Sequence, residues 1–247
     1  MNEPDVMVYL MTGFLDSGKS QFLKFTLTQD YFQIDGTTLL ILCEEGEEEF
    51  DPLEMAKHGV KIIKIEEQEE LTEAFLNELH EKYSPERVVI EYNGMWKVSD
   101  FEALSLPQGW EIEQKLTTVD ASTFQMYLNN LKPLFVEMVR GAELVLFNRC
   151  TDIEPLAGYR RSVKVVSPQA EVIFEDENGE IENIFGDDVP YDLNAPVIEI
   201  PREDYGIWYV DVMENPDRYK GKVIEFTAKV LSRKDFRPRY FFRDGWR

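Results

Sequence analysis

Short apolar runs and amphipathic stretches alternate along the first two thirds of the chain. The apolar runs have the length of β-strands and cover residues 6–11, 38–43, 60–65, 87–90, 116–119 and 142–147. The amphipathic stretches are predicted helices and cover residues 20–29, 69–83, 122–130 and 133–140. Continuously apolar strands are typical of sheets that helices cover on both faces. The pattern therefore predicts an α/β fold with a doubly wound, mostly parallel sheet.

The first apolar run ends at a loop that reads G-F-L-D-S-G-K-S over residues 13–20. This is the G-x-x-x-x-G-K-S pattern of a phosphate-binding loop, and a predicted helix follows it directly. Gly13 and Gly18 let the backbone turn its N–H groups toward an anion. Lys19 can reach the terminal phosphates, and the Ser20 hydroxyl can ligate Mg²⁺. We expect the nucleotide to be bound by Gly13, Asp16, Ser17, Gly18, Lys19, Ser20 and Gln21.

Polar residues at strand ends are the next candidates, because ligands of open α/β sheets lie at the carboxyl ends of the strands. Glu91 follows the run at 87–90 directly, where phosphate-loop hydrolases place the carboxylate that holds Mg²⁺ or its water shell. Gly94 lies three residues further, and a glycine there lets its N–H approach a γ-phosphate. The alternative is an ordinary acidic strand end followed by a turn.

The charge balance limits the partners. Of the 247 residues, 48 are acidic and 26 are basic, which gives a net charge of −22. Such a chain repels phosphate backbones and anionic lipids, so we expect neither nucleic acid nor a membrane as a partner. The cysteines Cys43 and Cys150 form no disulfide framework, and the N-terminal residues do not resemble a signal peptide. We expect a cytoplasmic protein.

Taken together, the motifs resemble the CobW-type GTPases, which are relatives of the nickel-insertion GTPases of urease and hydrogenase and include metallochaperones. Besides the loop, residues 43–51 resemble the first-switch pattern N-E-F-G-x-x-x-x-D, in which Cys43 replaces Asn and Glu44, Gly46 and Asp51 fall in register. Residues 91–94 match the second-switch pattern E-x-S-G, with Asn93 in place of Ser. The segments T-V-D-A at 118–121 and S-P-Q-A at 167–170 extend the resemblance over residues 6–175.

The resemblance implies a Mg²⁺-dependent hydrolase of a nucleoside triphosphate, with GTP expected, that acts as a metallochaperone-like switch on an unidentified client protein. It implies that Lys19 bridges the β- and γ-phosphates and that Gly94 senses the γ-phosphate. Glu44 or Asp51 would position the attacking water. The implied Mg²⁺ ligands are Ser20, Glu91 and Asp51. We expect slow turnover, because no arginine near the motifs is an obvious finger. The alternatives are a nucleotide-binding regulatory or scaffold protein with little hydrolysis, and a kinase-like phosphotransferase.

The chain departs from the family pattern at the base motif and at the metal motif. The guanine-reading pattern N-K-x-D is matched by N-R-C-T-D over residues 148–152, so Asp152 comes one residue late. We expect Asn148 and Asp152 to contact guanine, with ATP or relaxed specificity as the alternative. The family's C-x-C-C is absent, but five glutamates lie within the six residues after Cys43. We expect Cys43 to pack at the strand end, and a second divalent ion such as Zn²⁺ near it is the alternative.

The composition changes after about residue 185, and we expect a GTPase-like domain over residues 1–185 and a small β-rich region over 186–247. A turn at 176–180 precedes this change. Strands are predicted at 196–200, 208–212, 223–231 and 240–242, and the segment from residue 215 resembles the start of an OB-like barrel. The basic residues of the C-terminal end are Lys229, Arg233, Lys234, Arg237, Arg239, Arg243 and Arg247. We expect this end to make protein contacts, either with the acidic domain or between protomers of a homo-oligomer.

Overall fold

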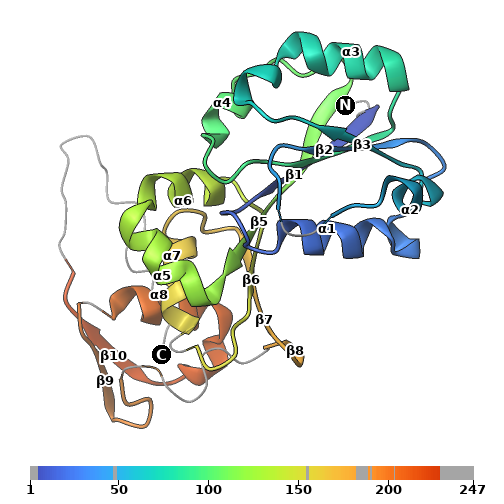
Figure 1. Ribbon diagram of the computed structural model, residues 1–247. Helices are drawn as coiled ribbons and strands as arrows, with labels where there is room; N and C mark the ends of the chain where they lie inside the picture. Colours follow the sequence, from blue (N-terminus) through green and yellow to red (C-terminus); the bar gives the residue numbers. More distant parts are fainter. Residues whose placement is uncertain are drawn as a thin grey trace, which may run out of the picture. The chain divides into compact units, whose positions relative to one another are not determined.

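An eight-stranded sheet forms the framework of the larger part of the chain in this computed structural model, as Figure 1 shows. The structure describes residues 5–46, 49–153, 156–181, 189, 191–202 and 204–228. The sheet strands are β1 (Val6–Thr12), β2 (Thr38–Leu42), β3 (Val60–Lys64), β4 (Arg87–Glu91), β5 (Trp110–Asp120), β6 (Leu144–Asn148), β7 (Glu171–Asp176) and β8 (Gly179–Glu180). The helices of this part are α1 (Lys19–Leu27), α2 (Pro52–Lys57), α3 (Glu73–Tyr83), α4 (Val98–Glu102), α5 (Ala121–Asn130) and α6 (Lys132–Val139). A further helix, α7 (Leu156–Lys164), belongs to the smaller part up to residue 161 and to this part from residue 162.

The strand order places the end of β1 in the middle of the sheet. The order is β3-β2-β4-β1-β5-β6-β7-β8, and neighbouring strands run parallel except in the β7–β8 hairpin. From β1 the chain crosses to one side of the sheet for β2 and later to the other side for β5, so β1 ends at a topological switch point. The predicted doubly wound, mostly parallel sheet is confirmed, and the predicted turn at 176–180 forms the hairpin.

Helices cover the central strands on both faces, because these strands are apolar on both sides. Every residue of β2 and of β4 is buried. In Figure 1, α1 and α2 lie on one face and α3 and α4 on the other. Leu23 and Leu27, four residues apart on α1, belong to the same buried cluster as Met11 and Leu40 of the sheet. This packing fixes the start of α1 beside the end of β1. No helix among the described residues is long and apolar enough to cross a membrane.

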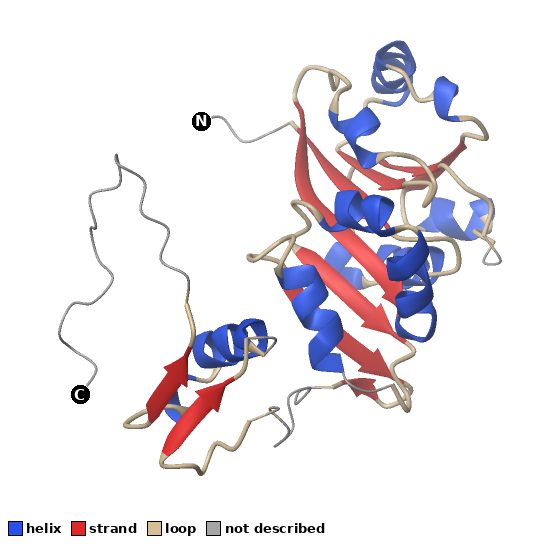
Figure 2. Ribbon diagram, turned by 90° about the vertical axis from the view of Figure 1, so that its left-hand side faces the viewer, coloured by secondary structure: helices blue, strands red, loops and turns tan. Residues whose placement is uncertain are grey.

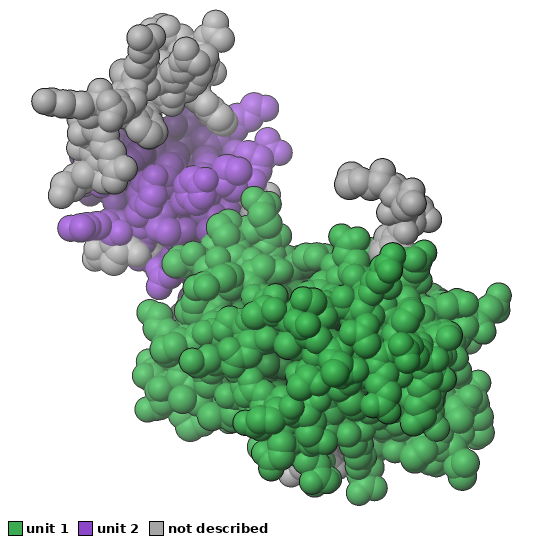
Figure 3. Space-filling model, turned by 90° about the horizontal axis from the view of Figure 1, so that it is seen from above, with its two compact units in different colours: residues 1–154, 162–182 green, residues 155–161, 183–247 purple. Residues whose placement is uncertain are grey.

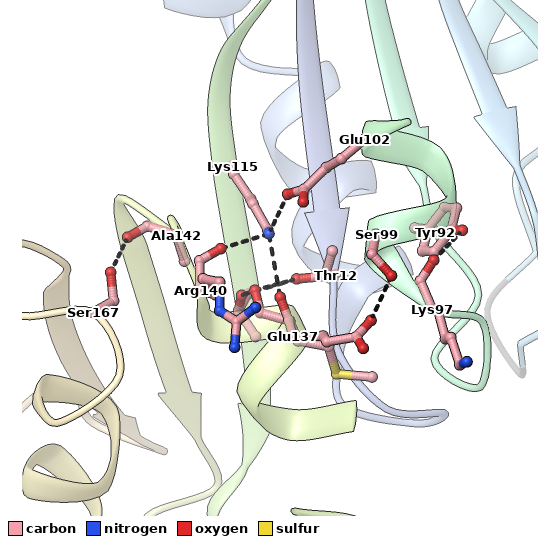
Figure 4. A network of polar contacts seen from close by, with 12 residues as sticks. Thr12, Tyr92, Lys97, Ser99, Glu102, Lys115, Glu137, Arg140, Ala142 and Ser167 are labelled. Carbon is pink, nitrogen blue, oxygen red and sulfur yellow. Dashed lines mark hydrogen bonds and ion pairs between the residues drawn. The ribbon is translucent and has the colours of Figure 1, made fainter. Parts of the chain in front are cut away.

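A polar network around the buried Lys115 joins the sheet to α4 and α6 (Figure 4). The Lys115 ammonium on β5 donates to the backbone oxygen of Arg140 at 2.6 Å and to Glu102 Oε1 at 3.0 Å, and so ties α6 and α4 to the sheet. The hydroxyls of Thr12 and Thr117 lie 2.8 Å apart and join β1 to β5. The residue before the phosphate-binding loop is therefore fixed by side-chain as well as backbone hydrogen bonds.

The chain divides into two compact units, drawn in separate colours in Figure 3. Residues 1–154 and 162–182 form the first, and residues 155–161 and 183–247 form the second. In the second unit, β9 (Val197–Ile200) and β10 (Val223–Phe226) pair in parallel (Figure 2). They are connected by α8 (Tyr205–Glu214). The described part of this unit is thus a βαβ arrangement, whereas an OB-like barrel begins with antiparallel strands.

The prediction of a strand at 208–212 is wrong, since these residues belong to α8. Trp208 and Val212 are four residues apart, so on a helix both face the small core around Ile198 and Tyr219. The predicted strand at 240–242, the C-terminal part of the one at 223–231 and the basic end from Lys229 to Arg247 lie outside the described residues, as does the predicted boundary at 185–186.

Candidate functional site

The loop after β1 depends on glycine where it meets α1. Gly18 has a φ of +90°, and a Cβ at this position would lie 2.5 Å from Asn148 Nδ2. Gly13, at the other end of the loop, also has a positive φ. The Ser17 hydroxyl lies 2.9 Å from that of Thr118, a β5 residue that the sequence motifs do not assign to the site. The rule that ligands lie at strand ends could have identified Thr118, because it sits near the carboxyl end of β5.

The first turn of α1 offers an anion-binding site. Gly18 is the N-cap and provides no side-chain acceptor, so the first backbone N–H groups of the helix have no carbonyl partner within it. These groups and the helix dipole favour a bound anion. A cavity of about 100 Å³ opens beside this turn. Its walls include the predicted nucleotide-binding residues Asp16, Gly18, Lys19, Ser20 and Gln21, together with Glu44, Glu91 and Arg149.

The Lys19 side chain is buried, with 2% of its surface exposed, and all of its donors have acceptors. Its ammonium donates to the backbone oxygens of Gly13 at 3.0 Å and Phe14 at 2.9 Å. It also forms an ion pair with Oε1 of Glu44. The other carboxylate oxygen of Glu44 accepts a hydrogen bond from the backbone N–H of Gly94 at 3.1 Å. One carboxylate therefore connects the phosphate-binding loop to the second switch.

Glu91 and Ser20 form a pair that fits a magnesium ion. The Ser20 hydroxyl donates to Glu91 Oε1 at 2.6 Å. Glu91 Oε2 is buried and has no hydrogen-bond partner among the described residues. Burial raises the pKa of Glu91, although the Ser20 hydrogen bond and the Lys19 charge act in the opposite direction. A buried carboxylate oxygen without a partner, beside a hydroxyl and a phosphate-binding loop, is the donor set that Mg²⁺ takes in nucleotide sites.

Asp51 makes none of its described contacts with Ser20 or Glu91. Its carboxylate caps α2 by accepting from the backbone N–H of Leu53 at 2.8 Å. No contact among the described residues joins Asp51 to Ser20 or Glu91, so its predicted role as a metal ligand stays a prediction. Its neighbours Phe50 and Pro52 border a cavity of about 370 Å³ that Ser20 and Glu91 also line.

The base motif is attached to the phosphate-binding loop. Asn148 Nδ2 donates to the backbone oxygen of Ser17 at 2.8 Å. Arg149 Nη1 donates to the backbone oxygen of Asp16 at 2.8 Å and to Asp120 Oδ2 at 2.6 Å. Burial alone would raise the pKa of Asp120, but the hydrogen bonds from Ser122 and Arg149 outweigh it and lower this pKa.

Asp152 is placed by the backbone but not by a described side-chain contact. It is exposed and has a φ of +58° in the turn after β6. Whether its carboxylate reads guanine therefore stays a prediction.

Cys43 is packed in the core. It is fully buried, and its backbone N–H donates to the oxygen of Glu91 at 3.0 Å. Burial raises the pKa of the Cys43 thiol far above its usual range, and the charges of Glu91 and Glu44 add to this, so the sulfur is a protonated thiol. In the part of the chain that the structure describes, no cluster of three or more His, Cys, Asp or Glu side chains could hold a metal ion. The packing expected for Cys43 is confirmed.

A family model and several solved structures resemble this chain. The nucleotide-binding domain of the CobW/HypB/UreG family matches residues 7–174. The Zn(II)-bound YjiA GTPase from E. coli is 21% identical with a TM-score of 0.54, and the alignment covers 74% of this chain and 60% of that one. A Zn(II)-bound triple mutant of YjiA has the same identity and coverage with a TM-score of 0.53. The chain thus aligns with about three fifths of the length of these neighbours, and at this identity the likeness concerns the fold. A comparison with curated proteins gave no match.

Proposed function

This chain belongs to the CobW/HypB/UreG nucleotide-binding family, and we propose that it is a Mg²⁺-dependent GTPase that acts in the cytoplasm as a metallochaperone-like switch on a client protein. One observation carries the proposal. Lys19, Ser20 and Glu91 line a single cavity at the switch point of the sheet, and Glu91 has a buried oxygen whose partner is missing among the described residues. A cation, a hydroxyl and such a carboxylate are the parts that phosphoryl transfer needs for positioning and charge compensation.

In this proposal the chain supplies the phosphate site mainly through its backbone. The N–H groups of residues 16–19 would bind the β-phosphate, and Lys19 would bridge the β- and γ-phosphates. Ser20 and Glu91, with Asp51 as a further candidate, would hold Mg²⁺, which when bound neutralises charge on the phosphate oxygens. Gly94 would donate its N–H to the γ-phosphate.

Hydrolysis would need the first switch to change its arrangement. Glu44 or Asp51 would position the attacking water, yet Glu44 is paired with Lys19 and Asp51 caps α2. Arg149 borders the phosphate cavity, but its guanidinium is held by Asp120 and the loop. We therefore expect slow intrinsic turnover.

Guanine would be bound by Asn148 and Asp152. The attachment of Asn148 to the phosphate-binding loop supports a base site beside it. Because Asp152 comes one residue later than in N-K-x-D, use of ATP or relaxed specificity is the alternative.

GTP and Mg²⁺ are thus the proposed ligands. The YjiA neighbours are described as Zn(II)-bound. For this chain Zn²⁺ near Cys43 is the weaker alternative, since that thiol is buried and protonated. Protein contacts through the C-terminal region, including a homo-oligomer, are part of the proposal.

A second candidate function is a nucleotide-binding regulatory protein with little hydrolysis. The observation that favours it is the pairing of Glu44 with Lys19, because a carboxylate held in this ion pair is not free to position an attacking water.

Phosphate release tests both candidates. Release from GTP and from ATP is measured side by side with Mg²⁺ for wild type, Lys19→Ala and Asp152→Ala. Slow release from GTP that is lost in Lys19→Ala supports the GTPase, and loss of GTP preference in Asp152→Ala supports its role in base reading. Nucleotide binding without release supports the regulatory protein, and absence of binding refutes both.

A further inference from the structure

The Glu44 carboxylate interacts with two donors at once. One oxygen pairs with the Lys19 ammonium, and the other accepts from the Gly94 N–H at 3.1 Å. Both side chains of the ion pair are buried, with 2% of Lys19 and 7% of Glu44 exposed. Glu44 also forms part of the wall of the phosphate cavity of about 100 Å³. An anion of this chain thus lies where the site offers its cation and a switch N–H.

These two donors are the ones that a γ-phosphate would use. In phosphate-loop sites the loop lysine reaches the terminal phosphates. Gly94 lies directly against the loop, since a Cβ built on it would be 2.6 Å from the oxygen of Gly13. The segment is fixed there by hydrogen bonds on both sides, from Tyr92 N to the oxygen of Met11 at 2.9 Å and from Cys43 N to the oxygen of Glu91 at 3.0 Å. The space between the two donors is therefore set by the sheet.

Resting on the proposed function, we propose that Glu44 is a specificity-determining residue that holds the γ-phosphate position when no triphosphate is bound. Its two oxygens take the contacts that two γ-phosphate oxygens would take. A diphosphate leaves Glu44 in place, because its β-phosphate meets the loop, the first turn of α1 and Lys19, whose three donors leave one for Glu44, while the Gly94 N–H stays with the carboxylate. A triphosphate has to displace Glu44, because two anions cannot share one ammonium and one N–H at contact distance.

Displacing the Glu44 carboxylate costs free energy, and only the binding of a triphosphate requires this displacement. Separating a buried ion pair leaves one charge to be solvated again and the other to find a new partner. The γ-phosphate provides that partner for Lys19, but the Glu44 carboxylate must move out with its segment. Glu44 therefore lowers the affinity for the triphosphate relative to the diphosphate. It also couples γ-phosphate binding to the position of the acidic switch.

The test compares Glu44→Gln with Glu45→Gln. Glutamine keeps the shape and the acceptor of Glu44 but removes the charge. Glu45 is adjacent, exposed and equally charged, and so controls for the general loss of one negative charge. The dissociation constants for GDP and for a non-hydrolysable GTP analogue are measured with Mg²⁺. We expect Glu44→Gln to shift their ratio toward the analogue by about tenfold, a typical coupling between sites, and Glu45→Gln to leave the ratio within about twofold.

An unchanged ratio in Glu44→Gln, or a shift toward GDP, would overturn the inference and leave the proposed GTPase standing. Failure of wild type to bind either nucleotide would refute the proposed function itself. A measurement without nucleotide tests the ion pair on its own, independently of the proposed GTPase function. Thermal unfolding of Lys19→Met, Glu44→Gln and the double variant should give a double-variant loss smaller than the sum of the single losses. Additive losses would show that the ion pair is absent and would also overturn the inference.

Discussion

Replacing Gly94 with alanine tests how tightly the second switch lies against the phosphate-binding loop. The new Cβ would lie 2.6 Å from the oxygen of Gly13, 2.8 Å from Cα of Phe14 and 3.0 Å from the backbone nitrogen of Leu15. Non-bonded carbons prefer about 3.5–4.0 Å, so one segment must move by about 1 Å. All three neighbours are backbone atoms, which cannot rotate away. Overpacking of this kind costs about 1–3 kcal/mol of unfolding free energy.

The assay is thermal unfolding together with nucleotide binding. A loss of about 2 kcal/mol corresponds to a fall of about 4–8 °C in the unfolding temperature of a chain of this size. Movement of the loop should also weaken binding of a GTP analogue by about tenfold, the equivalent of about 1.4 kcal/mol. Gly206→Ala on α8 is the control, because its Cβ would meet only flexible side-chain atoms of Arg161, the nearest at 3.3 Å. If Gly94→Ala unfolded and bound nucleotide like wild type, the close contact would not exist.

Three further predictions concern single groups of the site. Glu91→Gln should not lower the stability of the nucleotide-free protein, since it removes a buried charge with an unpartnered oxygen, yet it should weaken Mg²⁺ binding to the nucleotide complex by about tenfold in a magnesium titration. Arg149→Ala should lower the unfolding free energy by about 0.5–1 kcal/mol, because Arg149 is half exposed, and adding Asp120→Ala should cause little further loss in denaturant titrations. Burial raises the pKa of Cys150 to about 11 and that of Cys43 further, so a thiol reagent at about pH 8 should find both thiols slow in the native protein and reactive after unfolding.

The fold of the first unit could be predicted because its signals are local. The run in β2 is apolar from Leu39 to Leu42 and the run in β4 from Val88 to Ile90, and this pattern has one common explanation, a strand buried on both faces. Part of the helix at 205–214 was predicted as a strand, and the reason is physical. Its apolar residues are dense enough to suit a strand as well as a helix, and only the tertiary contacts of Trp208 and Val212 decide between the two.

The candidate site was predicted one residue at a time, and its arrangement was not. The motifs assign Lys19, Glu91 and Gly94 to phosphate or metal, and the structure brings them to one edge of the sheet. They could not place Asp51, whose position depends on the segment between it and Glu44 rather than on a strand. Nor could they indicate that Arg149 would be tied to Asp120, because that pair joins two strand ends 29 residues apart.

The pairing of Lys19 with Glu44 follows from the same physics that makes the loop a phosphate site. Lys19 is a buried cation, and a buried charge without a partner costs about 3–5 kcal/mol. A nucleotide phosphate removes that cost when it is bound, so the nucleotide-free protein requires an anion of its own at the same place. A chain with a net charge of −22 has many, and among the described residues it is Glu44, two residues after the end of β2, that pairs with the ammonium. Family patterns describe each residue by its role toward the ligand, and for that reason they do not reveal that Glu44 compensates Lys19 when the ligand is absent.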